Sequence, residues 1–195
     1  NDSVTAGNGN NRVDAGTGDN TVASGTGNDY IVAADGNNLI SAGTDLNTVL
    51  TGNGNDIIET DINSGADSIQ SGRGNDSVYT GGGNDTIDLG EDNDTVIGGM
   101  GADDITLGTG VNRIIYNDAS ESTADPLVAG GLGYDVIHGI NFASGSGDVI
   151  VLPNRTAGMS YAVVGVLATD ANAPTMGLNA NIDTLSSDIE FALNS

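Results

Sequence analysis

A β-branched aliphatic residue recurs every nine positions along most of this chain. The series has thirteen members and one eleven-residue step, which follows Ile58: Val4, Val13, Val22, Ile31, Ile40, Val49, Ile58, Ile69, Val78, Ile87, Val96, Ile105 and Ile114. A nine-residue unit is too short to bury its apolar residue by itself, so the units must wind and stack on one another. We call this series the ladder; it predicts a solenoid of short repeats.

Polar and glycine positions recur in register with the ladder. The residue two before each ladder residue, here called the acid position, is always Asp or Asn: Asp2, Asn11, Asn20, Asp29, Asn38, Asn47, Asp56, Asp67, Asp76, Asp85, Asp94, Asp103 and Asn112. Gly dominates four and six residues before the ladder, with exceptions at Ala34, Asp45, Asn63 and Asp92. Glycine permits the positive φ of a tight turn, and Val or Ile suits a strand. Each unit therefore predicts one turn and one short strand.

The number of strands in each coil stays open at this point. Two units per coil give an eighteen-residue, two-sided roll. In the first half, however, acids occupy the acid position only at Asp2, Asp29 and Asp56, a spacing of 27 residues. That rhythm is the one expected of three strands per coil over residues 1–62.

Residues 1–116 resemble the RTX family of calcium-binding nonapeptide repeats. The resemblance is carried by segments such as Gly81-Gly82-Gly83-Asn84-Asp85-Thr86-Ile87 and Gly98-Gly99-Met100-Gly101-Ala102-Asp103-Asp104-Ile105. It implies an all-β fold, a parallel β-roll or β-solenoid with a C-terminal capping segment. It also implies that calcium bridges turns on the same side, two units apart. The implied pairs are Asp67 with Asp85, Asp85 with Asp103, and Asp76 with Asp94.

Calcium is also what the residue types favour, because it takes six to eight oxygen ligands from carboxylates and carbonyls. A glycine-rich turn exposes carbonyls, and one Asp per turn adds charge. The predicted ligands of several Ca²⁺ ions are the acids Asp2, Asp29, Asp56, Asp67, Asp76, Asp85, Asp94, Asp103 and Asp135, with Gly72, Gly74, Gly81, Gly83, Gly90, Gly99 and Gly101. In the alternative hypothesis, Asp and Asn serve only as turn formers. Five successive acids from Asp67 to Asp103 favour metal there, whereas Asn in the first half predicts weaker sites or none.

The pattern divides the chain into three parts. Residues 1–116 form the predicted roll, with a break near 60–64. Residues 117–155 contain a loop, a last repeat that includes Asp135, and closing strands that resemble the end of RTX domains. Residues 156–195 lose the glycine rhythm, and Ile182, Leu185, Ile189 and Leu193 follow a helical spacing. This part predicts a C-terminal cap; its last residues resemble a type I secretion signal, and a short capping helix is the alternative.

Charge and composition exclude several functions. Four Lys and Arg against 27 Asp and Glu give a net charge of −23, which rules out a nucleic-acid partner. There is no cysteine, no apolar run long enough to span a membrane, and no signal-peptide pattern at the start. The single histidine, His138, has no evident catalytic partners, and no catalytic motif occurs. The sequence therefore predicts a protein that is not an enzyme.

The expected function is calcium-dependent folding. Charge repulsion is expected to keep the chain unfolded in low-calcium cytosol, and calcium outside the cell to fold it. The predicted role is a structural module of a secreted surface-layer, matrix or adhesin protein. The alternative is the secretion and folding domain of an exported protease or lipase. Because the chain begins in mid-repeat, we expect it to be a piece of a longer protein, and the open edge of its first coil predicts end-to-end self-assembly.

Ice binding is a third and weaker hypothesis. Thr17, Thr26, Thr44 and Thr109 share one turn position, as an ice-binding row would require. Other residues interrupt that row: Asp35, Arg73, Gly82, Glu91 and Met100.

Overall fold

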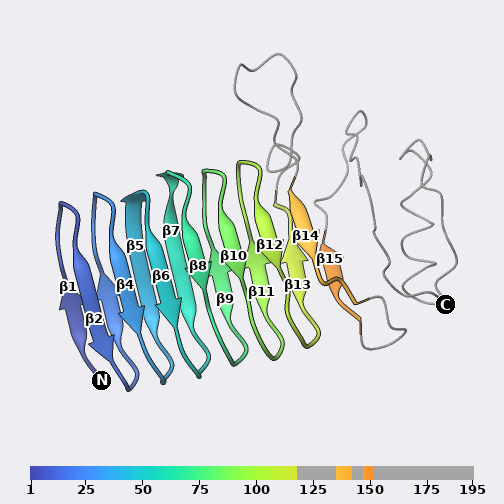
Figure 1. Cartoon of the computed structure of the whole chain (residues 1–195), viewed down its shortest axis with the longest axis horizontal. Coiled ribbons are helices and arrows are strands. Elements are labelled where there is room, and N and C mark those ends of the chain that lie inside the picture. Colours follow the sequence, from blue (N-terminus) through green and yellow to red (C-terminus); the bar gives the residue numbers. More distant parts are fainter. Residues whose placement is uncertain (118–134, 142–146, 152–195) are drawn as a thin grey trace, which may run out of the picture.

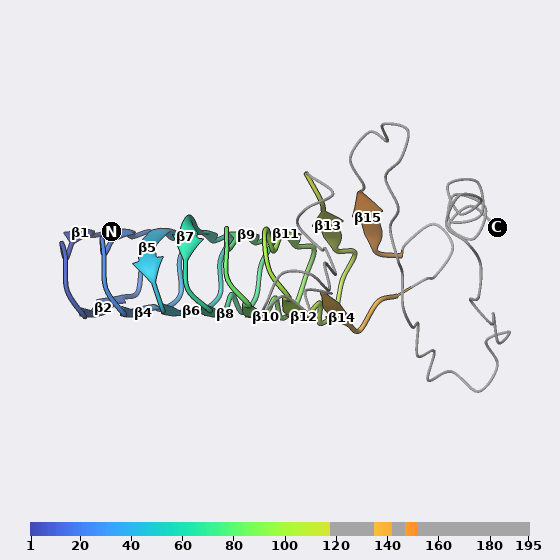
Figure 2. The ribbon, with the colours of Figure 1, turned by 90° about the horizontal axis from the view of Figure 1, so that it is seen from above.

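A computed structural model describes residues 1–117, 135–141 and 147–151, and in these residues it contains fifteen β-strands and no helix. The strands run as a regular stack along the long axis of the molecule (Figure 1). Strands with odd numbers form one parallel sheet, and strands with even numbers form a second parallel sheet that faces it (Figure 2). These are called the odd sheet and the even sheet. The prediction of an all-β parallel solenoid is confirmed.

The strands are short, as a nine-residue unit requires. The odd sheet contains, in spatial order, β1 (Ser3–Thr5), β3 (Thr21–Ala23), β5 (Leu39–Asp45), β7 (Ile57–Ser64), β9 (Ser77–Tyr79), β11 (Thr95–Ile97), β13 (Arg113–Ile115) and β15 (Val149–Val151). The even sheet contains, in chain order, β2 (Arg12–Gly16), β4 (Tyr30–Ala33), β6 (Thr48–Thr51), β8 (Ser68–Gln70), β10 (Thr86–Asp88), β12 (Asp104–Thr106) and β14 (Val136–His138).

Each coil has two strands along the whole described roll. In the first half Val4 pairs with Val22, and Val13 pairs with Ile31, so neighbouring strands of one sheet are eighteen residues apart. The three-sided alternative for residues 1–62 is therefore wrong. Asp29 precedes an even strand, whereas Asp2 and Asp56 precede odd strands, so the 27-residue rhythm of acids has no counterpart in the winding.

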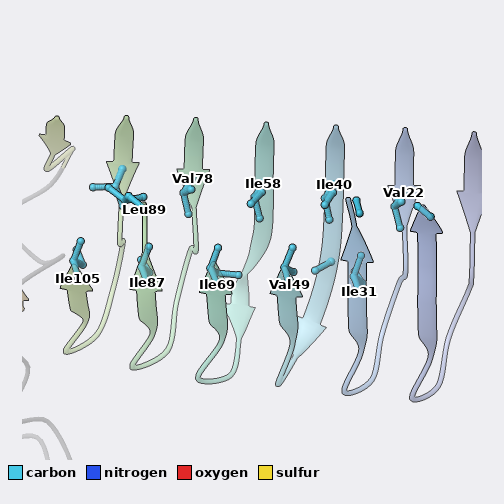
Figure 3. Close-up of a cluster of buried hydrophobic side chains, with 14 of the residues drawn as sticks. Val22, Ile31, Ile40, Val49, Ile58, Ile69, Val78, Ile87, Leu89 and Ile105 are labelled. Atoms are coloured by element: carbon cyan, nitrogen blue, oxygen red, sulfur yellow. The ribbon is translucent and has the colours of Figure 1, made fainter. Parts of the chain in front are cut away.

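The ladder residues form the core between the two sheets. Every member from Val13 to Ile114 is buried, and Val4 is partly buried against the others. Figure 3 shows ladder residues such as Ile40 and Ile58 stacked along one sheet, opposite Ile69 and Ile87 on the other. Each packs on an identical or similar side chain one coil away, for example Ile69 on Ile87 and Ile87 on Ile105.

A second inward column lies two residues after each ladder residue, as the two-residue period of a strand requires. The buried members of this column are mostly small near the start and become larger later: Ala15, Ser24, Ala33, Ala42, Thr60, Ser71, Thr80, Leu89 and Leu107. The Ser24 and Ser71 hydroxyls donate to the carbonyls of Ala42 and Leu89, at the same column one coil later. Sequence reasoning missed this column because its members share no single residue type.

One long strand accommodates the two extra residues of the eleven-residue step. β7 is the longest of the described strands, and its pairing with β5 shifts register between Ser41 and Gly43 and again between Gly43 and Asp45. After this irregularity β7 pairs with β9 in the ordinary register, Ile58 opposite Val78. Both sheets therefore continue through residues 60–64, and the pairing irregularity lies where the sequence predicted a break in the repeat.

The core makes a direct stability prediction. Ile87→Ala should cost about 2–5 kcal/mol, because Ile87 is buried between Ile69 and Ile105 and the solenoid cannot collapse around one missing side chain. Thr86→Ala, on the exposed side of the same strand, should change stability by no more than about 0.5 kcal/mol. Urea unfolding at saturating calcium measures both, and equal losses in the two variants would contradict the assignment of the inward face.

Some predictions fall outside the described residues. These are the loop after residue 117, most of residues 142–155, and the C-terminal cap or secretion signal over 156–195.

Candidate metal site

The acid positions lie in two rows, one along each edge of the solenoid where the chain turns from one sheet to the other (Figure 1). The row that precedes the odd strands, called the odd row, holds Asp2, Asn20, Asn38, Asp56, Asp76, Asp94 and Asn112. The row that precedes the even strands, called the even row, holds Asn11, Asp29, Asn47, Asp67, Asp85, Asp103 and Asp135.

Within each row, one side-chain oxygen links consecutive coils. The backbone N–H of Asp67 donates to Oδ1 of Asp85 at 2.8 Å, and that of Asp85 donates to Oδ1 of Asp103 at 2.9 Å. The N–H of Asp76 likewise donates to Oδ1 of Asp94 at 2.8 Å. The three pairs implied by the RTX resemblance are thus direct neighbours in the stack.

The remaining predicted acids join the same rows at less buried places. The N–H of the exposed Asp2 donates to Oδ1 of Asn20 at 2.8 Å. Oδ1 of the half-buried Asp135 accepts the N–H of Asp103 at 3.0 Å. Asp2 and Asp135 therefore belong to the rows in register, although solvent reaches both.

Sequence reasoning missed Asp148 as a member of the odd row. Its Oδ1 accepts the N–H of Asn112 at 2.6 Å, and its Oδ2 accepts the N–H of Asn141 at 2.7 Å. The signal was present in Gly147-Asp148-Val149-Ile150, but this unit lies outside the nine-residue register. Because both of its oxygens accept hydrogen bonds, Asp148 differs from repeat acids such as Asp76, Asp85 and Asp94.

The second carboxylate oxygen of five repeat acids is buried without a hydrogen bond. These oxygens are Oδ2 of Asp29, Asp56, Asp76, Asp85 and Asp94. Neighbouring hydroxyls donate elsewhere, since Thr51 donates to the carbonyl of Ser71, Ser71 to that of Leu89 and Thr80 to that of Gly98. A buried, charged oxygen without a partner is costly unless a proton or a cation neutralises it.

Burial also raises the pKa of four repeat acids. It raises the pKa of Asp94 to about 7, against a lowering effect of the hydrogen bond from the Asp76 N–H. Burial likewise raises the pKa of Asp76 and of Asp85 to about 6, and raises the pKa of Asp56. In the absence of a cation, the fold therefore favours the protonated acids.

The Asn turns show which backbone groups face the second side-chain atom. Nδ2 of Asn20 donates to the carbonyl oxygens of Gly18 at 2.7 Å and Gly16 at 3.3 Å, two and four residues earlier in the same turn. In the turn of Asp85 the corresponding carbonyls belong to Gly81 and Gly83. The other predicted glycines, Gly72, Gly74, Gly90, Gly99 and Gly101, occupy the same two positions before Asp76, Asp94 or Asp103.

This donor set fits calcium. At the positions that the Asn turns use, each Asp turn has a carboxylate oxygen and two backbone carbonyls available, and calcium accepts both kinds of ligand. The described residues contain no group of three or more His, Cys, Asp or Glu side chains that could hold a metal. An ion in these turns would therefore take much of its coordination from the backbone.

Most turn glycines adopt the positive φ that the sequence predicted, with Gly52 and Gly65 as exceptions. Gly81 and Gly83 have φ of 78° and 131°. In the described residues, Asp45 and Asp92 are the non-glycine residues with positive φ, and both replace Gly in the column four residues before the ladder. Apart from Gly65, which lies next to the eleven-residue step, this column keeps a positive φ even where the sequence departs from glycine.

An exposed asparagine row was also missed by sequence reasoning. The N–H of Asn55 donates to Oδ1 of Asn37 at 2.7 Å, and the N–H of Asn75 donates to Oδ1 of Asn55 at 2.8 Å. These residues immediately precede the acid positions. Their amides join consecutive turns on the outside, so some of the Asn excess serves coil stacking and not metal binding.

His138 lies on the outer face of the even sheet. Its Nε2 is 2.8 Å from Oδ1 of Asp104, and both side chains are more than half exposed, 54% and 59%. Such an exposed pair contributes little to stability.

A parallel solenoid with buried acids in its turns defines a class of calcium-binding repeat proteins. The family model of the RTX calcium-binding nonapeptide repeat matches this chain in four copies, over residues 1–31, 23–58, 61–96 and 85–114. The chain therefore belongs to the RTX calcium-binding repeat family.

Comparison with curated proteins and with solved structures found no similar protein. In the described part of the chain, no helix has the length and apolar character needed to cross a membrane.

Proposed function

We propose that this chain is a calcium-dependent folding module, and that calcium neutralises the buried acids of its turns. The observation that carries the proposal is the set of buried Oδ2 atoms that accept no hydrogen bond, in a chain with a net charge of −23. With pKa values of about 6 to 7, Asp76, Asp85 and Asp94 are not fully protonated at pH 7, so a divalent cation is the proposed neutralising partner there.

The proposed ligands follow from the geometry of the rows. Asp56, Asp67, Asp76, Asp85, Asp94 and Asp103 supply carboxylates, and the carbonyls two and four residues before each acid supply further oxygens. Asp29 is buried in the same way but has Asn11 and Asn47 as neighbours in its row. Asp2 and Asp135 are more accessible and would form the outermost ligands.

Calcium binding then supplies folding free energy. An unfolded chain does not hold the carboxylates and carbonyls together, so calcium binds the folded state preferentially and stabilises it. Without calcium, repulsion among the acids opposes compaction. The coils with consecutive Asp turns would remain unfolded at low calcium and would fold at the millimolar calcium of the extracellular medium.

The test is a calcium titration of the calcium-stripped chain followed by circular dichroism. We expect a cooperative gain of β-sheet signal as calcium rises. Magnesium should not replace calcium, because the smaller ion keeps its own water ligands and binds all-protein sites reluctantly. An identical β-sheet signal in chelator and in saturating calcium would contradict the proposal.

The wider role that we propose is a structural module of a secreted bacterial surface-layer, matrix or adhesin protein. In support, the described residues outside the short connections are stacked repeats, and their proposed ligand sets suit extracellular calcium. The alternative role, as the secretion and folding domain of an exported enzyme, requires the same folding switch. The sequence of the complete gene distinguishes the two roles.

The winding does not favour ice binding. In an eighteen-residue coil, Thr17 and Thr109 lie on one edge, whereas Thr26 and Thr44 pair on the other. On the first edge Arg73 and Glu91 interrupt the row, and on the second it continues to Gly82 and Met100. The threonines therefore form no continuous surface.

A further inference from the structure

Four acid-position asparagines make a contact that no aspartate can make. Their side-chain amide donates back into its own turn. Nδ2 of Asn38 reaches the carbonyl oxygens of Ala34 at 3.1 Å and Gly36 at 2.9 Å. Nδ2 of Asn11 reaches those of Gly7 at 3.0 Å and Gly9 at 2.6 Å.

Asn20 and Asn47 follow the same rule. The Asn20 amide reaches the carbonyls of its turn as described above, and Nδ2 of Asn47 lies 3.4 Å from the Gly43 oxygen and 3.3 Å from the Asp45 oxygen. Asn112 does not follow it, since its amide donates to the carbonyl of Leu107.

The Oδ1 atom accepts the same hydrogen bond in Asn and in Asp. Oδ1 of Asn38 accepts the N–H of Asn20 at 3.1 Å, just as Oδ1 of Asp85 accepts the N–H of Asp67 at 2.8 Å. Asn and Asp turns are therefore alike in shape and in their link to the neighbouring coil. They differ at one atom, which is a neutral double donor in Asn and a charged acceptor in Asp.

That one atom decides whether a turn is complete without an ion. In an Asn turn, the amide supplies hydrogen bonds to the carbonyls, and no buried charge remains. In an Asp turn, an oxygen that cannot donate replaces the amide nitrogen, and Oδ2 of Asp76, Asp85 and Asp94 has no hydrogen bond.

We propose that the side-chain amides of Asn11, Asn20, Asn38 and Asn47 take the place of calcium in their turns, so that the coils of residues 1–51 fold without the ion. These coils then form a preassembled end, on which the calcium-dependent coils that follow are built. The proposal rests on the proposed function, because it assumes that the Asp turns bind calcium.

The order of residues in each row supports this division. In the odd row Asn20 and Asn38 follow the exposed Asp2 and precede Asp56, Asp76 and Asp94. In the even row Asp29 lies between Asn11 and Asn47 and is the one buried acid of residues 1–51, whereas the uninterrupted run of acids begins only at Asp67. Because each coil of a solenoid contacts only its neighbours, one end can be folded while the other is not, and folding propagates from the folded end.

Hydrogen exchange on the full chain, with and without calcium, tests the proposal. Without calcium, we expect the amides of β2–β6 to exchange at least about tenfold more slowly than in an unfolded chain. Those of β8–β12 should exchange as in an unfolded chain. In saturating calcium both segments should be protected.

Two double variants make the test specific. Asn20→Asp with Asn38→Asp should abolish the calcium-free protection of β2–β6 and add up to two calcium ions to the stoichiometry measured by calorimetry. Asn10→Asp with Asn55→Asp adds the same charge at exposed sites, where each Oδ1 still accepts the N–H of Asn28 or Asn75. This control should keep the wild-type exchange pattern and stoichiometry.

The reverse substitution covers the case in which the double variant fails to fold. Asp85→Asn supplies an amide to the carbonyls of Gly81 and Gly83, so this variant should fold in calcium and bind at least one ion fewer.

The outcomes separate the two proposals. If the wild type binds calcium but loses protection equally in both segments without it, the role of the asparagines is overturned and the calcium function stands. Calcium-free protection in the Asn20 and Asn38 variant equal to that in its control would also overturn that role. If the wild type binds no calcium and its hydrogen exchange is the same with and without the ion, the proposed function itself fails.

Discussion

Gly101→Ala should destabilise the calcium-bound solenoid by more than about 4 kcal/mol. Single substitutions have effects of this size only when they create a severe steric clash or an unsatisfied buried polar group. A Cβ atom at this position would overlap the carbonyl oxygen of Gly83 in the preceding coil. The φ of Gly101 is 147°, which an L-residue with a side chain rarely adopts. The carbonyl has little freedom to retreat, because it belongs to the backbone of a turn fixed on both sides by neighbouring coils.

Gly9→Ala is the matched control for this effect. Gly9 occupies the same column of the repeat and has φ of 99°, but a Cβ there would meet no atom within 4 Å. Gly9→Ala therefore introduces the strain of a positive φ without a steric clash. It should lower the free energy of unfolding by about 1 kcal/mol or slightly more. Urea unfolding at saturating calcium gives both values. Equal losses of stability in the two variants would show that the close approach of neighbouring coils is not the reason for glycine in this column.

Lowering the pH from 8 to 5 should increase the folded fraction of the calcium-free chain. Burial raises the pKa of Asp94 to about 7 and of Asp76 and Asp85 to about 6, whereas unfolded aspartate titrates near 3.8. Between about pH 7 and pH 4 the folded state therefore binds protons that the unfolded state does not. Stability then rises as the pH falls through this window, and it is lost as the pH rises through the folded pKa values.

Circular dichroism of the calcium-stripped chain against pH measures this effect. Asp94→Asn should weaken the pH dependence, because it replaces an acid whose buried form requires a proton. Asp19→Asn removes the same charge from an exposed site whose Oδ1 accepts the N–H of Asn37, and it should leave the dependence almost unchanged. If the β-sheet signal of the calcium-stripped chain grew with rising pH, the burial of acids without a neutralising partner would be contradicted.

Much of the fold could be predicted from the sequence because the repeat is local. The ladder, the turn glycines and the acid position each depend on residues within one nine-residue unit, and Ile87, Gly83 and Asp85 occupy the predicted places. The second inward column was not predictable in this way. Its members range from Ala15 to Leu107, since a thin interior constrains their volume and not their type.

The candidate site was predictable in its residues but not in its burial. The sequence identifies Asp76 and Asp94 as acids two residues before a strand, and this pattern suits a turn former as well as a calcium ligand. Only the stacked coils place their Oδ2 atoms out of water and without a hydrogen bond. Likewise, the sequence treats Asn38 as a weakened acid position, whereas the structure shows its amide donating to two turn carbonyls.

The sequence by itself therefore determined the unit of this protein: its strand, its turn, its inward residue and its affinity for calcium as a member of the RTX family. The tertiary structure decided how the units combine. Two or three strands per coil satisfy the same nine-residue pattern, because that pattern specifies only neighbours along the chain. The eighteen-residue pairing, Val13 with Ile31 and Ile87 with Ile105, decides between them, since hydrogen bonds between strands depend on which coils meet.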